Sequence, residues 1–122
     1  MTTERATSEA RGRGAEATCG WWLRAHGYRL LARRWRAPVG EIDIIARRGR
    51  SIAFIEVKAR ATLGGALDAV TPAQRRRIER AAEAFLSQHP KWRNLEVRFD
   101  VMAVRPGRLP HHLRDAWRPG RP

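Results

Sequence analysis

The chain has 122 residues, which is enough for one domain around one hydrophobic core and too few for two. Its formal net charge is +13, from 25 Lys and Arg residues against 12 Asp and Glu residues, and this excess favours a polyanionic partner because guanidinium groups bind phosphate oxygens in a fork. Without a run of 18 apolar residues, a signal segment or a second cysteine beside Cys19, the sequence predicts a cytoplasmic protein with no membrane partner and no internal disulfide. The composition of a GC-rich genome is an alternative source of the scattered arginines, although it does not account for so large a net excess.

The expected domain covers residues 12–117, between a flexible tail at residues 1–11 and another at residues 118–122. From Gly12 to His26, apolar residues recur at three- and four-residue steps. This spacing is typical of an amphipathic helix. Gly27 follows the last turn and is a suitable stop, because glycine is common just past a helix end.

A strand and a hairpin are expected after this helix. Tyr28–Arg36 predicts the first strand. Two β-rich runs, Glu41–Ala46 and Ser51–Ala59, flank a glycine-containing turn at residues 47–50 and predict a hairpin. In the expected register, the last residue of the first run pairs with the first residue of the second run.

The second half of the chain predicts a loop, a helix and a strand. Residues 60–70 carry two adjacent glycines and little pattern, so we expect a loop there. Thr71 and Pro72 then open a second helix with a cap and a proline at the first helical position, Gln74 suits a capping box, and Pro90 closes the helix. Its apolar face is formed by Ile78, Ala81, Ala82, Phe85 and Leu86.

The last segments complete an α/β pattern. Glu96–Val104 alternates between apolar and polar residues, which predicts a half-buried strand. His111–Trp117 is compatible with an additional edge strand at the C-terminal end. The order α-β-β-β-α-β predicts an α/β protein whose mixed β-sheet is flanked by helices.

The hairpin carries the residues that point to chemistry. In the expected register, Glu41 lies opposite Glu56, and Asp43 is a diagonal neighbour of Glu56. Because side chains alternate along a strand, Asp43, Glu56 and Lys58 then project from one face. A sheet gathers like charges at a cost, and a divalent cation with oxygen ligands removes that cost.

This arrangement predicts a magnesium centre. The two carboxylates of Asp43 and Glu56 and the backbone carbonyl of Val57 are suitable ligands for Mg²⁺, with Mn²⁺ as a substitute. The cation would activate water against a phosphodiester, and Lys58 would orient the water or stabilise developing charge. The alternative from spacing alone is a solvated outer face with a cross-strand Lys–Glu pair.

Two segments of the hairpin also resemble a family signature. Residues 40–46 (GEIDIIA) and 54–60 (FIEVKAR) look like those of the YraN-like family, as do residues 27–33, 69–72 and 98–101. This family of small bacterial proteins is similar to archaeal Holliday-junction resolvases and belongs to the PD-(D/E)xK nuclease superfamily. The resemblance covers about residues 12–104 and implies the restriction-endonuclease-like fold.

The resemblance also implies roles for single residues. It carries Asp43 and Glu56 over as metal ligands, Lys58 as the catalytic lysine and Glu16 as an additional ligand or water-orienting group. Taken alone, Glu16 is an ordinary exposed helix acid. The chain departs from the family pattern at Arg34, where asparagine is expected, and at Cys19, where a small residue is usual.

Further candidates lie on the second helix. Gln74 could contact the site or the nucleic acid, or serve only as part of the capping box. An arginine cluster at the helix start could bind phosphates or form a solvated face; its members are Arg75, Arg76, Arg77 and Arg80. On the strand at 96–104, Asp100 faces away from the apolar residues and is expected to form a salt bridge. The histidines lack partners at metal-ligand spacing.

The combined expectation is a Mg²⁺-dependent endonuclease that hydrolyses phosphodiester bonds in branched DNA, such as recombination or repair intermediates. Symmetric cleavage of a junction would favour a homodimer. An alternative is a non-catalytic nucleic-acid-binding protein, of DNA or RNA, that retains the fold and the charge. A third is an RNA-directed docking module of the translation or repair machinery.

Overall fold

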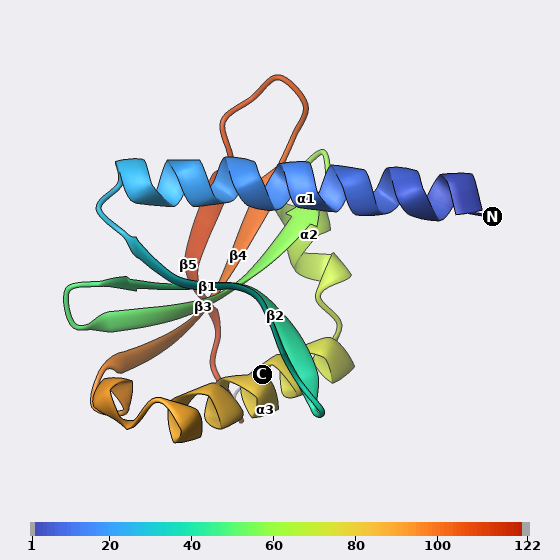
Figure 1. The fold of residues 1–122 in the computed structure, drawn as a ribbon. Helices are drawn as coiled ribbons and strands as arrows, with labels where there is room; N and C mark the ends of the chain where they lie inside the picture. Colours follow the sequence, from blue (N-terminus) through green and yellow to red (C-terminus); the bar gives the residue numbers. More distant parts are fainter. Residues whose placement is uncertain (1, 121–122) are drawn as a thin grey trace.

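A computed structural model describes residues 2–120, with side chains described from residue 14 onwards. It contains one five-stranded sheet and three α-helices (Figure 1). The elements are α1 (Thr2–Ala25), β1 (Arg29–Ala37), β2 (Gly40–Arg48), β3 (Ser51–Ala59), α2 (Leu63–Ala69), α3 (Pro72–Gln88), the 3-10 turn η1 (Pro90–Trp92), β4 (Glu96–Val104) and β5 (His111–Trp117). The expected α/β class, with a mixed sheet flanked by helices, is confirmed, and the additional C-terminal strand is present.

The sheet has the strand order β1-β2-β3-β4-β5. Its first three strands form an antiparallel meander, β4 runs parallel to β3, and β5 is antiparallel to β4. The segment with α2 and α3 supplies the crossover between the two parallel strands, as such a connection requires. The sheet is therefore mixed because of this one helical crossover.

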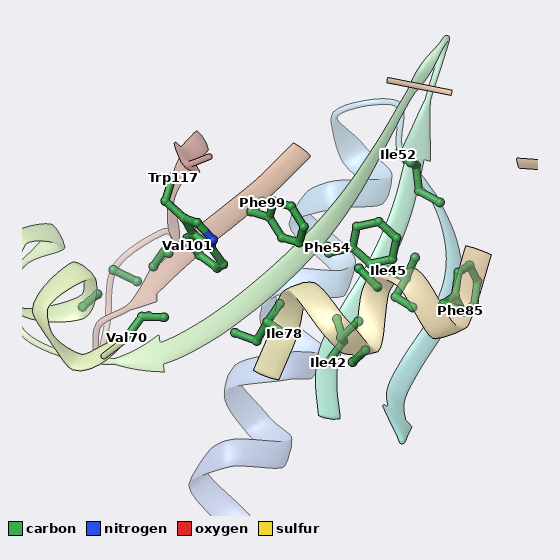
Figure 2. Packing of buried hydrophobic residues seen from close by; sticks show 14 residues of the cluster. Ile42, Ile45, Ile52, Phe54, Val70, Ile78, Phe85, Phe99, Val101 and Trp117 are labelled. Carbon is green, nitrogen blue, oxygen red and sulfur yellow. The ribbon is translucent and has the colours of Figure 1, made fainter. Parts of the chain in front are cut away.

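Two helices cover opposite faces of the sheet, α1 on one and α3 on the other (Figure 1). The larger apolar cluster lies under α3, where Ile78 and Phe85 of the helix pack against Phe54 and Phe99 of the sheet (Figure 2). The smaller cluster lies under α1 and includes Leu23. Because β3 is apolar on both sides, its central part is buried between the two layers.

The β2–β3 register differs from the expected one. Arg48 pairs with Ser51, and Ala46 pairs with Ala53 instead of with Ser51. The cause is a tighter turn, in which Gly49 adopts a left-handed φ of 59° so that only two residues connect the strands. Within the paired part of the hairpin, from Ile44 to Ile55, a shift of two residues keeps the side chains on their predicted faces, because the strand repeat is also two.

Two helix assignments also differ from the sequence-based expectation. The helix α1 begins at Thr2 instead of Gly12. In the expected C-terminal tail, Pro119 and Gly120 lie in a turn, and residues 121–122 lie outside the described part of the chain. Residues 63–69 form the helix α2 instead of a loop. The Thr62 side chain caps α2 by accepting a hydrogen bond from the Gly65 N–H, and burial of Ala66 outweighs the low helix propensity of its two glycines.

A buried polar network ties β4 to β5. The fully buried Asp100 carboxylate accepts hydrogen bonds from Arg98 and His112 and from the backbone N–H of Asp115. Burial alone would raise the pKa of Asp100, but these donors outweigh it and hold the pKa below its usual value. The salt bridge expected for Asp100 is therefore present, with Arg98 as its partner.

No helix in residues 2–120 is long and apolar enough to cross a membrane.

Candidate active site

The predicted acidic residues and the lysine meet in one cavity of about 310 Å³, where β2 separates from β3. The cavity lies between the middle of α1 and the start of α3. Its lining comprises Ala15, Glu16, Glu41, Asp43, Glu56, Val57, Lys58, Ala59 and Gln74. Four carboxylates and one lysine therefore share one small space.

A break in the alternation of β2 shapes this cavity. Ile42 and Ile45 belong to the same buried cluster on the α3 side (Figure 2), although strict alternation would place residues three apart on opposite faces. The ladder with β3 ends at Ile44 and Ile55. Beyond it, the Asp43 carboxylate replaces the partner strand by accepting the Val57 N–H at 2.8 Å.

The same contact orients the carbonyl of Val57. In an extended strand, the N–H and the C=O of one residue point to the same side. Because the Val57 N–H points to Asp43, its carbonyl also points toward the side that β2 has left. The carbonyl oxygen that the sequence suggested as a ligand thus lies on the cavity side of β3.

Glu56 is the most constrained acid of the cavity. It is 4% exposed, accepts a hydrogen bond from the Gln74 side chain and lies 3.9 Å from Lys58 Nζ. Burial raises the pKa of Glu56, the neighbouring Asp43 raises it further, and Lys58 offsets only part of the effect. A strongly perturbed carboxyl in a polar cavity is typical of a functional site.

Glu16 reaches the cavity from α1. The residue is 8% exposed, in contrast to an ordinary surface acid, and it pairs with the Arg34 guanidinium of β1. Burial raises the pKa of Glu16, an effect that the hydrogen bond from Arg34 only partly offsets and to which the charge of Asp43 adds. The helix α1 therefore contributes a fourth acid to the cavity beside the three of the hairpin.

The acids do not converge on one point. Among the residues whose side chains are described, no three His, Cys, Asp or Glu side chains are grouped to hold a metal ion. Each acid instead has a donor of its own: Val57 N–H for Asp43, Gln74 for Glu56 and Arg34 for Glu16. The oxygen donors available to a cation are nonetheless of the kind that Mg²⁺ takes, with water completing its shell.

The second-helix candidates divide into two groups. Gln74 faces the cavity and binds Glu56, while its N–H also completes the Thr71 cap. Arg75 is half-buried, donates to the Val70 carbonyl and lies over the Trp117 ring, so it holds the fold together. The other three arginines, Arg76, Arg77 and Arg80, are exposed on the first half of α3.

Sequence reasoning missed Arg34 as a neighbour of the site. Its φ of 50° is unusual for a residue that is not glycine. The one available signal was the departure from the family's asparagine, because asparagine tolerates a left-handed φ better than most residues. The ion pair with Glu16 crosses from β1 to α1, so no local pattern could indicate it.

The chain was compared with known proteins. A family model described as uncharacterised protein family UPF0102 matches residues 15–104. A UPF0102 protein of Maricaulis maris is 52% identical over 98% of this chain and 94% of its own length, and one of Paramagnetospirillum magneticum is 49% identical over 91% and 89%. A third, from Caulobacter vibrioides, is 50% identical over 87% of this chain and 85% of its own length.

Proposed function

This chain belongs to the UPF0102 family, and we propose that it is a metal-dependent endonuclease acting on branched DNA. The observation that carries the proposal is the gathering of Asp43, Glu56 and Lys58 in one cavity with a buried, strongly perturbed Glu56. A purely structural face would leave these charges in solvent, where they cost nothing. Here Glu56 is buried beside the partly exposed Asp43 and Lys58, and a bound cation would offset the cost of burying its charge.

The proposed cofactor is Mg²⁺, with Mn²⁺ as a substitute. Asp43, Glu56 and the carbonyl of Val57 would hold it, with Glu16 as an additional ligand. A divalent cation in this cavity supplies Lewis-acid chemistry, because it acidifies water and stabilises negative charge on a phosphate. The chain's own contribution is a cavity whose negative charge favours the cation.

Lys58 supplies the complementary positive charge. Its side chain is 21% exposed and sits beside Glu56 on the same strand. From there the ammonium group can donate to a phosphate oxygen or to an attacking water, and so stabilise the charge that develops during cleavage. Gln74 holds the Glu56 carboxylate from the opposite wall and keeps it directed into the cavity.

The proposed substrate is DNA with a branch, bound by charge and shape. The helix α3 that carries three exposed arginines also reaches the cavity, because Gln74 contacts Glu56 and the Arg77 backbone lies close to Gly40 of β2. Such arginines bind phosphates without reading sequence. Cleavage of a symmetric junction on both sides would require two such centres, and we therefore propose a homodimer on DNA.

The proposal is tested with a labelled four-way junction and a linear duplex, each incubated with purified protein and Mg²⁺, Mn²⁺ or EDTA. We expect junction cleavage with either cation and none with EDTA. Glu56→Ala and Lys58→Ala should each reduce cleavage by about 100-fold or more, because each removes charge stabilisation from the reaction, while binding of the junction persists.

The controls are exposed residues of the same types, Glu83→Ala and Lys91→Ala, which should cleave like the wild type. If wild type and variants bind equally and none of them cleaves any substrate with either cation, the enzyme proposal is wrong. The non-catalytic nucleic-acid-binding protein would then be the better account.

A further inference from the structure

Arg34 occupies a strained position beside the candidate site. It lies between the paired positions Arg33–Ile44 and Trp35–Ile42 of β1 and β2, and therefore at the level of Asp43. Its φ of 50° is in the left-handed region, which disfavours residues with a Cβ. Strain of this kind persists only where the surrounding contacts compensate for it.

The compensating contact is the ion pair with Glu16. The Arg34 guanidinium donates from Nε to the Glu16 carboxylate, whose side chain is 10% exposed, whereas the Arg34 side chain is 35% exposed. One end of the ion pair is thus enclosed in the cavity wall and the other reaches solvent. The guanidinium retains further N–H groups that can bind a second anion.

The acids that line the cavity outnumber its lysine, so a positively charged group beside them, such as the Arg34 guanidinium, reduces their repulsion. Glu16, Asp43 and Glu56 line the cavity together with Glu41, and Lys58 is the lysine that faces them. Glu41 has an exposed partner in Arg36 at 3.4 Å. Arg34 neutralises the carboxylate of Glu16. A cation bound to Glu16 would therefore compete with Arg34 for that carboxylate.

We propose that Arg34 is a displaceable counter-ion, which pairs with Glu16 while the site lacks a cation and is released to a phosphate of the nucleic acid when a divalent cation claims Glu16. The inference rests on the proposed function and adds a regulatory contact to it. Arg34 thereby weakens cation binding in the free protein and links it to nucleic-acid binding. The two ligands then bind cooperatively, because each releases a group that the other needs.

The first test measures Mn²⁺ affinity by isothermal titration calorimetry at pH 8 without nucleic acid. Arg34→Asn should bind Mn²⁺ about tenfold more tightly than the wild type, because it removes the competing charge and asparagine accepts the left-handed φ. Arg34→Lys keeps the charge and should stay within about threefold of the wild type. The matched control is Arg33→Asn, which removes an exposed arginine on the same strand.

The second test measures binding of a fluorescent four-way junction by Lys58→Ala, which slows cleavage without removing a proposed metal ligand, with and without Arg34→Asn. Released Arg34 should contribute one phosphate contact, so Arg34→Asn should weaken binding and lower the slope of log affinity against log salt by about one. The effect should require Mn²⁺ concentrations that saturate the site and should disappear in EDTA.

Three outcomes distinguish a failure of the proposed metal centre from a failure of the counter-ion inference. If Asp43→Asn binds Mn²⁺ as well as the wild type does, the metal centre of the proposed function is wrong. If Asp43→Asn abolishes Mn²⁺ binding but Arg34→Asn does not raise the Mn²⁺ affinity, only the counter-ion inference fails. Equal effects of Arg34→Asn and Arg33→Asn would likewise overturn it, because net charge alone would explain the change.

Discussion

At the scale of single residues, Glu56 is a buried acid whose ionisation opposes the stability of the fold. Its carboxylate is 4% exposed and shares the cavity with Asp43. Lys58 at 3.9 Å is too distant for a full hydrogen bond to it. Burying this carboxylate lowers the free energy of unfolding. A function would explain the loss, because active sites often sacrifice stability for activity.

Glu56→Gln should therefore stabilise the metal-free protein at pH 8. The folded-state pKa of Glu56 is raised, so its ionisation in the fold opposes stability increasingly as pH rises above the unfolded value of about 4.3. Glutamine removes that penalty and still accepts from Gln74. We expect a gain of roughly 1 to 3 kcal/mol, since one pKa unit corresponds to about 1.4 kcal/mol.

Urea unfolding at pH 8 and pH 4 measures the gain, which should be small at pH 4, where Glu56 is protonated in the folded state and mostly protonated in the unfolded state. Millimolar Mn²⁺ should reverse the ranking, because the wild type gains stability from binding and the variant does not. A Glu56→Gln protein less stable than the wild type in EDTA at pH 8 would contradict the account.

At the scale of elements, the close approach of β2 to α3 holds the separated end of the hairpin in place. A Cβ on Gly40 would lie 2.7 Å from the Arg77 carbonyl oxygen, a backbone atom that cannot rotate away. Glycine is therefore required here for proximity. The approach brings the start of β2 under α3 and so places Asp43 near the residues that Gln74 contacts.

Gly40→Ala tests this role. The added methyl should push β2 away from α3 and lower the free energy of unfolding by about 1 to 3 kcal/mol, as overpacking usually does. It should also reduce the stabilisation by Mn²⁺, since Asp43 moves with the strand. Gly14→Ala is the control, because a Cβ there meets nothing within 4 Å and alanine favours a helix by about 0.5 to 1 kcal/mol. If Gly40→Ala leaves the stability and the Mn²⁺ response unchanged, glycine is not required for the close approach of β2 to α3.

At the scale of the whole molecule, the net charge of +13 is distributed over a small domain and opposes its own compactness. A polyanion that neutralises it would stabilise the fold. The exposed arginines Arg76, Arg77 and Arg80 follow Gln74 on the helix α3, whereas other exposed arginines, such as Arg24, Arg50 and Arg93, lie on other elements or loops. The positions of the arginines, and not only their number, should therefore determine the affinity for DNA.

The triple variant Arg76→Ala, Arg77→Ala, Arg80→Ala should lose about two to three units of the salt slope in junction binding, because each phosphate contact contributes about 0.7 to 0.9. The triple variant Arg24→Ala, Arg50→Ala, Arg93→Ala removes the same charge and should lose less than one. Fluorescence anisotropy over a range of salt concentrations gives both slopes. Equal losses would mean that the protein binds DNA by net charge without an oriented surface.

The strands and the main core helix α3 followed from the sequence alone, because the alternation of apolar residues and the turn signals are local. Asp43, Glu56 and Lys58, which the sequence put close together in the hairpin, line one cavity, although β2 breaks its alternation beside Asp43. The helix α2 did not follow from the sequence, since two glycines hide a segment that tertiary burial of Ala66 stabilises. The break in β2 at Asp43, the burial of Glu16 and its pairing with Arg34 were decided only in the tertiary structure. Each depends on a contact between side chains or backbone groups of different elements, and sequence spacing carries no information on which group of one element reaches which group of another.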